Sequence, residues 1–466
     1  MISVRRRGAA RLAAAVLASG LVAAGAIATA GTAAADDAPP SQGGATATLG
    51  GLKTFDKAII HDNGKDQQVG AGLFEMSVDN GGSIQTYCID LHNPTQSKAK
   101  YEEKSWAETS LANNPDAGKI NWVLQNSYPQ VNDLGALAKK AGIDGALTEK
   151  TAAAGTQVAI WRFSDKANVD AADPQAEKLA DYLEKNAQNL QEPKASLSLD
   201  PPAVSGKAGE RLGPVKVHTN ADSVTLAPGT ESAGGVKLVD KTGKTITSAA
   251  DGGEVYFDVP EGAADGSATL TAQAATKVPV GRAFASATKS QTQILAGSSE
   301  STVSATATAN WAKKGAVPAV SAEKDCAKGG VDITASNKGD EAFTFELLGQ
   351  KYTVEAGQSK TVTAPVKEDQ SYKFTISGPN GFEKTFSGVL DCKTSSSGGS
   401  SGDTPSSQPS PASAGGSTGG DTSGGDLAET GSSSNTPMIA GIAVALVVVG
   451  GGAIFFVRKK KATAGE

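Results

Sequence analysis

The chain has 466 residues, of which 20% are charged and 5% aromatic, and its formal net charge is −6. Removal of the leader and of the segment after Thr430, both described below, would take away four arginines and a net three further positive charges, giving −13. Such an acidic surface repels phosphate backbones, so nucleic acid is excluded as an expected partner.

Residues 1–35 have the features of a cleaved secretory signal peptide. Four arginines precede an Ala/Leu/Val-rich stretch, and three alanines at 33–35 precede Asp36. The alternative, a membrane anchor, would need a longer and more apolar run. We therefore expect export, with residues 36–48 as a linker.

Residues 49–193 are expected to form an α+β domain. Alternating patterns over 72–78 and 83–89 come first and predict strands. Helical spacing of apolar residues follows over 119–124, 134–141, 147–163 and 175–190. Strands followed by helices are typical of the α+β class.

Two all-β sandwich (Ig-like) modules are expected next, at residues 195–312 and 317–392. Both contain short alternating runs separated by Gly, Pro, Asn and Asp turns. Residues 393–426 are rich in Ser, Gly, Pro and Thr and cannot bury a core, which predicts a disordered linker. The β modules would act as a stalk.

The C-terminal end predicts a membrane span and a processing site. Residues 438–457 are apolar and long enough to cross a bilayer, and residues 458–466 form a basic tail that favours the cytoplasmic side. Upstream stands a pentapeptide of Leu427, Ala428, Glu429, Thr430 and Gly431. This order of elements resembles a sortase sorting signal of Gram-positive bacteria. The resemblance implies that sortase cuts after Thr430 and joins it to a cell-wall precursor; the alternative is a plain single-span membrane protein.

The chain has three cysteines, an odd number that requires an explanation in an exported protein. Cys326 and Cys392 bracket the last β module, and we expect them to form a disulfide. The chain-entropy model gives such a loop roughly 4 kcal/mol of stabilisation. Cys88 is then left over.

Three ordinary roles are open to Cys88. It could be an inert buried residue, since free cysteine is among the most buried residue types. It could form an intermolecular disulfide. It could also be the nucleophile of a thiol hydrolase or acyltransferase with His92 or His61 as base.

A fourth role rests on two local sequences, Tyr87-Cys88-Ile89-Asp90 and residues 156–161, Thr-Gln-Val-Ala-Ile-Trp. Together they resemble the paired signatures of the thioester domains of Gram-positive surface adhesins, over about residues 49–193. The resemblance implies that Cys88 supplies the thiol and Gln157 the acyl carbon of an internal thioester. A primary amine of a ligand would then attack the Gln157 carbonyl, with Cys88 as leaving group.

Residues around this pair suit a protected thioester. On a helix, Gln157 shares a stripe with Ala153, Ile160 and Trp161, so its amide should face the core. We expect water to be excluded by the apolar side chains of Tyr87, Ile89, Ile160 and Trp161. Thr156 could orient the amide and Asp90 could assist proton transfer, although capping and turn roles suit both equally.

A further hypothesis concerns the middle module. Adhesin stalks often carry Lys–Asn isopeptide bonds assisted by an acid, and Lys216 and Asn310 lie on candidate first and last strands. Glu254 or Asp258 would be the acid. Solvated surface positions are the simpler alternative.

The sequence therefore predicts a wall-anchored adhesin that captures amine-bearing ligands, such as a protein lysine or a polyamine, in a single turnover. No cofactor or metal motif is expected. The competing functions are a non-covalent structural surface protein with an inert Cys88 and a secreted thiol hydrolase or acyltransferase.

Overall fold

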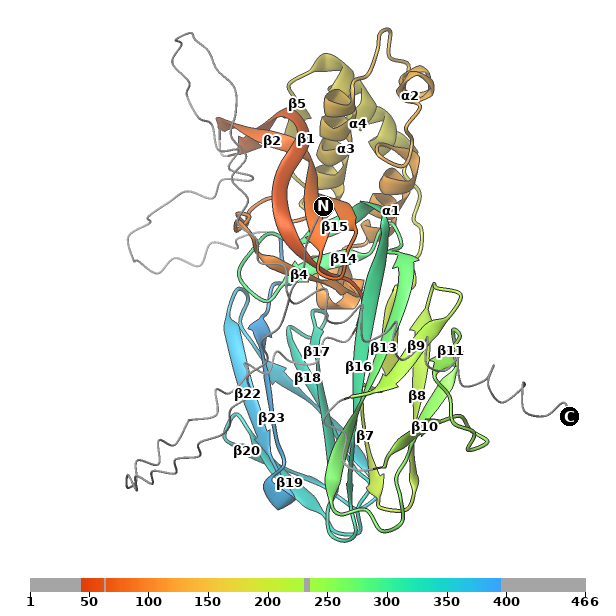
Figure 1. The fold of residues 1–466 in the computed structure, drawn as a ribbon. Coiled ribbons are helices and arrows are strands. Elements are labelled where there is room, and N and C mark those ends of the chain that lie inside the picture. The colour runs from red at the N-terminus through yellow and green to blue at the C-terminus, as the bar shows by residue number, and fades with distance from the viewer. Residues whose placement is uncertain (1–42, 63, 230–234, 395–466) are drawn as a thin grey trace, which may run out of the picture. The chain divides into compact units, whose positions relative to one another are not determined.

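The computed structural model describes residues 43–62, 64–229 and 235–394, and Figure 1 shows their elements. The expected leader, the sorting motif Leu427–Gly431 and the apolar span 438–457 lie outside these residues, as does nearly all of the linker 393–426. Among the helices of the described ranges, none has the length and apolar character needed to cross a membrane.

The first domain is built on a seven-stranded antiparallel sheet in the order β2-β3-β15-β14-β4-β1-β5. Because β2 also pairs with β1, six of these strands form a closed ring of pairings. The strands are β1 (Thr46–Asp62), β2 (Lys65–Val78), β3 (Ser83–Cys88), β4 (Lys100–Lys104), β5 (Val169–Ala171), β14 (Ala283–Ser286) and β15 (Gln293–Ser298).

Helices pack against this sheet, as the spacing of apolar residues predicted. They are α1 (Ala117–Asn126), α2 (Leu134–Lys140), α3 (Glu149–Ser164) and α4 (Pro174–Asn186), with short 3₁₀ turns η1 (Trp106–Glu108) and η2 (Ser110–Asn113). Helix α3 is buried on nearly all sides, and its first turn is capped by the Thr148 side chain, which accepts from Thr151 N–H at 3.1 Å. A Cβ at Gly155 would lie 2.4 Å from Ala176 O, so glycine is what allows α3 and α4 to approach this closely.

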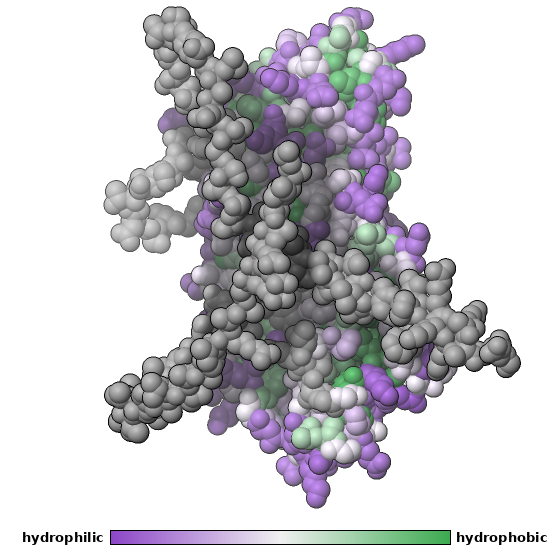
Figure 2. Space-filling view, in the orientation of Figure 1, coloured by the Kyte–Doolittle hydropathy of each residue, from purple (hydrophilic) through white to green (hydrophobic). Residues whose placement is uncertain are grey.

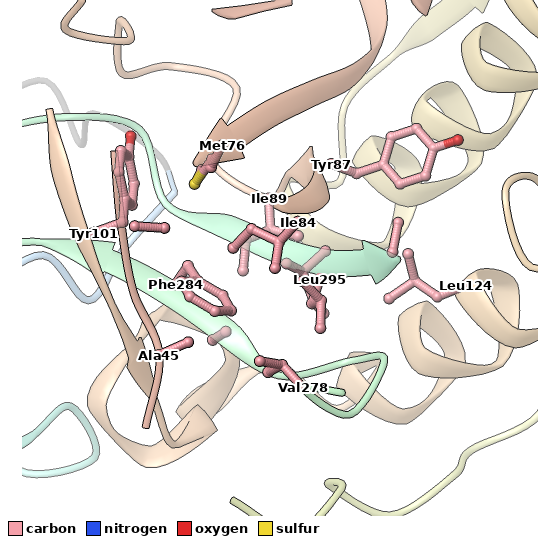
Figure 3. Close-up of a cluster of buried hydrophobic side chains, with 14 of the residues drawn as sticks. Ala45, Met76, Ile84, Tyr87, Ile89, Tyr101, Leu124, Val278, Phe284 and Leu295 are labelled. Carbon is pink, nitrogen blue, oxygen red and sulfur yellow. The ribbon is translucent and has the colours of Figure 1, made fainter. Parts of the chain in front are cut away.

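Strands β14 and β15 come from the segment that was expected to belong wholly to the middle module. They lie between β4 and β3 and complete the first sheet. Arg282, just before β14, is buried and its Nε donates to the buried Glu103 carboxylate of β4 at 2.9 Å. Figure 3 shows Phe284 and Leu295 in the same buried cluster as Met76 and Ile84. The first domain is therefore discontinuous in sequence, and the expected boundary near residue 193 does not separate the two folding units.

The remainder of residues 195–312 forms the expected two-sheet sandwich. One sheet contains β10 (Lys237–Val239), β12 (Glu254–Asp258), β8 (Arg211–Thr219) and β6 (Leu197–Asp200) in that order. The other contains β11 (Ser248–Ala249), β9 (Val224–Pro228), β13 (Gly266–Lys277), β16 (Glu300–Ala312) and β7 (Ala203–Lys207). The long pair β13–β16 continues directly into β14 and β15, which links the sandwich to the first sheet.

The last module is all β. Its strands are β17 (Pro318–Asp325), β18 (Gly330–Asn337) and β21 (Ser359–Pro365) in one sheet, with hairpins β19 (Phe343–Leu347)–β20 (Gln350–Val354) and β22 (Ser371–Ser377)–β23 (Glu383–Val389), and a short turn η3 (Pro379–Gly381). The expected disulfide Cys326–Cys392 is present, with a Cα–Cα distance of 5.2 Å. Cys326 N–H donates to Ala107 O at 3.1 Å, so this end of the module contacts the first domain.

Hydrophilic side chains cover much of the visible surface of the described residues (Figure 2). The large apolar side chains are mostly internal; Leu190 and Leu348 are the large hydrophobic residues that are exposed within the described ranges. Cys88 is among the buried residues.

The discontinuous sheet predicts how fragments behave. A fragment of residues 43–193 lacks β14 and β15, leaving unpaired edges on β3 and β4 and a gap in the apolar cluster. We expect it to unfold without a cooperative thermal transition, whereas residues 43–312 should melt cooperatively by circular dichroism. Equal melting temperatures for the two fragments would contradict this assignment of the strands.

Candidate functional site

Cys88 is the last residue of β3 and is completely buried. On one side β15 continues alongside it: Gln293 lies opposite Cys88, and Ile89 N–H donates to Thr292 O at 3.1 Å. On the other side β2 pairs with β3 only as far as Thr86. The main chain of Cys88 therefore needs non-strand partners on that side.

The side-chain carboxamide of Gln157 takes the place of the missing strand. Its Oε1 accepts from Cys88 N–H at 2.9 Å, and its Nε2 donates to Cys88 O at 2.8 Å. The amide thus reproduces the two-point pairing of a β-ladder. Gln157 is fully buried, and these bonds satisfy its oxygen and one of its amide protons away from water. The structure brings together the two residues that the sequence paired.

Neighbouring hydroxyl groups fix the helix and the strand that carry this pair. Thr156 Oγ1 donates to Ala152 O at 2.7 Å and is hydrogen-bonded to Ser127 Oγ at 2.6 Å. Tyr87 donates its hydroxyl proton to Tyr128 O at 2.7 Å. Thr156 therefore holds α3 against the loop after α1; among the hydrogen bonds of the described residues its hydroxyl has none to the Gln157 amide, so the capping role has more support than the orienting role.

The apolar residues expected to shield the pair are all buried. Their exposed fractions do not exceed 2%: Tyr87, Ile89, Ile160 and Trp161. Figure 3 shows Tyr87 and Ile89 with the other buried side chains around β3 and β15. Such surroundings exclude water from an electrophilic carbonyl.

The sulfur lies between weak donors and negative charges. Asp90 N–H donates to Cys88 Sγ at 3.2 Å, and the buried Trp161 Nε1 has no hydrogen-bond partner of normal geometry among the described residues. Burial raises the pKa of the Cys88 thiol well above its usual value, and the charges of Asp165 and Asp90 raise it further. The Trp161 side chain and Asp90 N–H act in the opposite sense. Cys88 is therefore a neutral thiol near pH 7, unlike the thiolate of a cysteine hydrolase.

The two histidines considered as bases do not serve Cys88. His61 Nδ1 is 2.7 Å from Asp66 and its Nε2 is 3.1 Å from Asp170, both on the outer part of the domain. His92 makes no hydrogen bond to Cys88 within the described part of the chain. A hydrolase dyad therefore has no geometric support.

The residues of the isopeptide hypothesis are not brought together. Lys216 is exposed on β8, opposite Glu254 of β12, and Asp258 lies in the same four-stranded sheet. Asn310 lies on β16 of the other sheet, and its Nδ2 donates to Pro318 O at 3.2 Å. An exposed lysine on one sheet cannot meet an asparagine of the other sheet without rearrangement of the sandwich.

One group of three acidic side chains within the described ranges has carboxylate oxygens within 4.8 Å of one another: Glu368, Asp369 and Asp391. Glu368 accepts from Cys392 N–H at 2.6 Å, and Asp369 pairs with Lys289 at 3.2 Å. Groups of the protein itself therefore already donate hydrogen bonds or pair with these carboxylates, and we assign no metal or cofactor to them.

Four residues near Cys88 escaped the sequence analysis. Gln293 and Thr292 come from β15 and the buried turn before it, Asp165 from the end of α3, and Asp391 from the last module. The one sequence signal was that Thr292-Gln293 repeats the Thr-Gln pair of residues 156–157. The nearness of Thr292 and Gln293 to Cys88 depends on pairings between segments about 200 residues apart.

The arrangement has the parts that acyl transfer requires. The carbonyl oxygen of Gln157 already accepts a backbone N–H, which can stabilise negative charge on that oxygen. The nitrogen of the amide donates to Cys88 O. An amine that leaves or enters at the Gln157 carbonyl carbon can occupy the same position and make the same hydrogen bond. Asp90 N–H reaches the sulfur, which is the other group bound to the carbonyl carbon in a thioester.

Comparison with known proteins bears on this segment. Residues 85–189 match the family model of the thioester domain, and residues 318–389 match that of the bacterial phospholipase C C-terminal domain. The first match contains both Cys88 and Gln157, so the two paired residues of the site lie in the segment that is similar to the thioester domain. It includes neither β1 and β2 nor the β14–β15 pair.

Two solved structures are similar to the chain at low identity. The Bacillus anthracis TIE protein is 15% identical, with 75% of this chain and 81% of that chain covered and a TM-score of 0.27. The thioester domain of the Enterococcus faecium TIE86 protein is 16% identical, with 58% and 97% covered and a TM-score of 0.27. A search of curated proteins gives no significant match.

The environment of Asp165 predicts a pH dependence of stability. Its carboxylate accepts from Leu91 N–H at 2.8 Å and from Ser164 Oγ at 2.6 Å, and burial raises its pKa from 3.8 to about 7. Between these values the folded chain keeps a proton that the unfolded chain has lost. The free energy of unfolding should therefore fall as pH rises through this window, by roughly 2–4 kcal/mol from this group.

Asp165→Asn remains neutral: its Oδ1 can accept from Leu91 N–H, and its Nδ2 can donate to Ser164 Oγ, which reverses the direction of the second bond. Urea denaturation at a series of pH values should show the variant gaining stability over the wild type as pH rises from 4 to 7. A constant difference between the two proteins would contradict a raised pKa at Asp165.

Proposed function

We propose that the chain is a wall-anchored surface protein that captures amine-bearing ligands through an internal thioester between Cys88 and Gln157. The observation that carries this proposal is the pairing of the Gln157 carboxamide with the main chain of Cys88, at 2.9 and 2.8 Å, in a fully buried site. The match of residues 85–189 to the thioester domain supports it independently.

Thioester formation is a condensation within the folded chain. Cys88 Sγ attacks Gln157 Cδ, the S–C bond forms, and the C–N bond breaks. Nε2 leaves as ammonia and takes the thiol proton. Cys88 N–H stabilises the charge that develops on Oε1 during the attack. Because both groups are held by hydrogen bonds before reaction, little orientational entropy is left to lose.

Ligand capture reverses the roles of nitrogen and sulfur. An amine nitrogen attacks Gln157 Cδ, an amide forms, the C–S bond breaks, and the sulfur ends as the Cys88 thiol. The entering N–H can donate to Cys88 O, as the Gln157 amide does in the free chain. The product is an amide, which is less electrophilic than a thioester and therefore stays in place.

A single turnover follows from this chemistry. The bound ligand stays attached to Gln157, so the thioester is not regenerated. The chain then acts as a covalent binder and not as a thiol hydrolase that turns over. The raised pKa of Cys88 argues against a thiol hydrolase, whose nucleophile rests as a thiolate; in the proposed site Cys88 acts as a nucleophile once, when the thioester forms, and as the leaving group at capture.

The ligand class is a primary amine, such as a protein lysine or a polyamine. Export by the signal at residues 1–35 and sorting at Leu427–Gly431 would place the domain outside the wall, linked through Thr430 by a sortase. The β modules would carry the domain away from the wall. These assignments rest on sequence patterns outside the described residues.

The thioester predicts a mass lower by one ammonia than the sequence mass for a protein of residues 36–430, measured by intact mass spectrometry. Incubation with methylamine should add one methylamine to this form. Cys88→Ala and Gln157→Ala should each have the full sequence mass and add none.

Gln293→Ala is the matched control, because Gln293 is a second buried carboxamide directly opposite Cys88. This variant should retain the ammonia deficit. If the deficit were lost in Gln293→Ala and kept in Gln157→Ala, the residue that supplies the acyl group would be Gln293 and not Gln157. A wild-type mass equal to the sequence mass, with Cys88 open to alkylation after unfolding, would refute the thioester.

Wall attachment predicts a separate result in a Gram-positive host that expresses a sortase for this motif. The wild-type chain should be released only by digestion of the wall, and Thr430→Ala should shift it to the membrane or medium fractions. Equal wall fractions, measured by immunoblotting of cell fractions, would contradict sorting at Thr430.

A further inference from the structure

Asp90 is a buried residue whose main chain contacts the reacting sulfur and whose carboxylate has one oxygen without a hydrogen-bond partner among the described residues. It is 1% exposed, and its own N–H contacts Cys88 Sγ at 3.2 Å. Oδ2 accepts from Asn93 Nδ2 at 2.9 Å and from Thr292 N–H at 3.4 Å, but Oδ1 has no hydrogen-bond partner among the described residues. A buried carboxylate oxygen without a donor is costly, so an entering donor would be bound favourably there.

The chemistry proposed for Cys88 and Gln157 supplies such a donor. When an amine attacks Cδ, its nitrogen gains positive charge and must lose a proton before a stable amide remains. A carboxylate within reach of the reacting atoms can accept this proton as a general base. The proton can then pass to the departing sulfur, which leaves Asp90 as it began and Cys88 as a thiol.

The last β module contributes a second carboxylate to the same place. Thr292 joins the two: its N–H donates to Asp90 Oδ2 and its Oγ1 donates to Asp391 Oδ2 at 3.3 Å. Asp391 immediately precedes Cys392, which the disulfide to Cys326 ties to the module. The module in turn contacts the first domain, since Asn113 Nδ2 donates to Cys326 O at 3.0 Å.

We infer that Asp90 is the proton acceptor for the entering amine at the Cys88–Gln157 site, and that Asp391 of the last module tunes Asp90 through Thr292. This inference rests on the proposed function. It makes the reactive site a product of two domains, because the tuning carboxylate lies about 300 residues after Asp90 in the chain.

Electrostatics agree with this assignment. Burial raises the pKa of Asp90 well above its usual value, and the charge of Asp391 raises it further, against the hydrogen bond from Asn93. Asp165 adds a smaller effect in the same direction. A carboxylate with a raised pKa is a stronger base than an ordinary surface aspartate.

Other charges act on Asp391 from the last module. Burial raises the pKa of Asp391 to about 6; Lys324 opposes this rise, while Glu368 and Asp369 add to it. Lys289, from the turn before β15, is paired with Asp369 at 3.2 Å. Asp90 and Asp391 therefore titrate as an interacting pair, and a change at one should be measurable at the other.

The test is the rate of methylamine addition to a protein of residues 36–430, which retains every described residue. The rate is measured by intact mass at a series of pH values and divided by the concentration of unprotonated methylamine. For the wild type this corrected rate should rise with pH as Asp90 loses its proton and then level off. Asp90→Asn should lose the rise and react at least about 100-fold more slowly at the plateau.

Asp391→Asn should rise at lower pH, because loss of its negative charge lowers the pKa of Asp90, and should level off at or somewhat below the wild-type plateau, because Asp90 is then a weaker base. The carboxamide oxygen of this variant can still accept from Thr292, so the melting temperature should be unchanged. Asp332→Asn is the matched control: it removes a carboxylate of the same module that bonds Lys328 and Thr363. Its pH profile should coincide with that of the wild type.

The outcomes separate this inference from the proposed function. If the wild type adds methylamine but Asp90→Asn reacts equally fast, Asp90 is not the proton acceptor. If Asp391→Asn rises at the wild-type pH, the last module does not tune the site. If the wild type has no ammonia deficit and adds no methylamine, the thioester itself is refuted and this inference with it.

Discussion

The site depends on one unusual pairing, in which a side-chain amide completes a β-ladder. Strand β2 leaves β3 after Thr86, and the Gln157 carboxamide bonds the exposed main chain of Cys88 in its place. The carboxamide that satisfies the Cys88 main chain also contains the carbonyl carbon that the proposed reaction uses. The same two hydrogen bonds therefore satisfy the backbone and hold Gln157 next to Cys88. The buried helix α3, capped and closely packed on α4, makes this alignment rigid.

The opposite edge of β3 makes the domain discontinuous. From Ile84 to Cys88 this edge pairs with β15, which the sandwich supplies through the long β13–β16 pair. The buried Arg282–Glu103 contact fixes the start of that insertion. The turn before β15 then carries Thr292 to Asp90, and the disulfide-bound end of the last module meets it there. Modules that the sequence suggested as a stalk therefore also build the site.

Local patterns in the sequence predicted much of this structure. Apolar spacing located the four α-helices of the described ranges, the odd number of cysteines led to the pairing of Cys326 with Cys392, and two short motifs paired Cys88 with Gln157. The predictions that failed concerned contacts between residues far apart in the sequence. The four-residue strand β14 has no pattern that names its partner, and Lys216 was matched to Asn310 without knowledge of which sheet each strand joins. Asp391 could not be connected with Asp90, because the link between them through Thr292 depends on how the last module meets the first domain.

The covalent bond itself is the central claim, and tandem mass spectrometry of a proteolytic digest under mildly acidic conditions tests it most directly. The account predicts one cross-linked product that joins the peptide containing Cys88 to the peptide containing Gln157, short of one ammonia, and its conversion by methylamine into a free Cys88 peptide and a Gln157 methylamide. Recovery of both peptides unlinked before any amine is added, with Cys88 as a thiol and Gln157 as an unmodified glutamine, would contradict it.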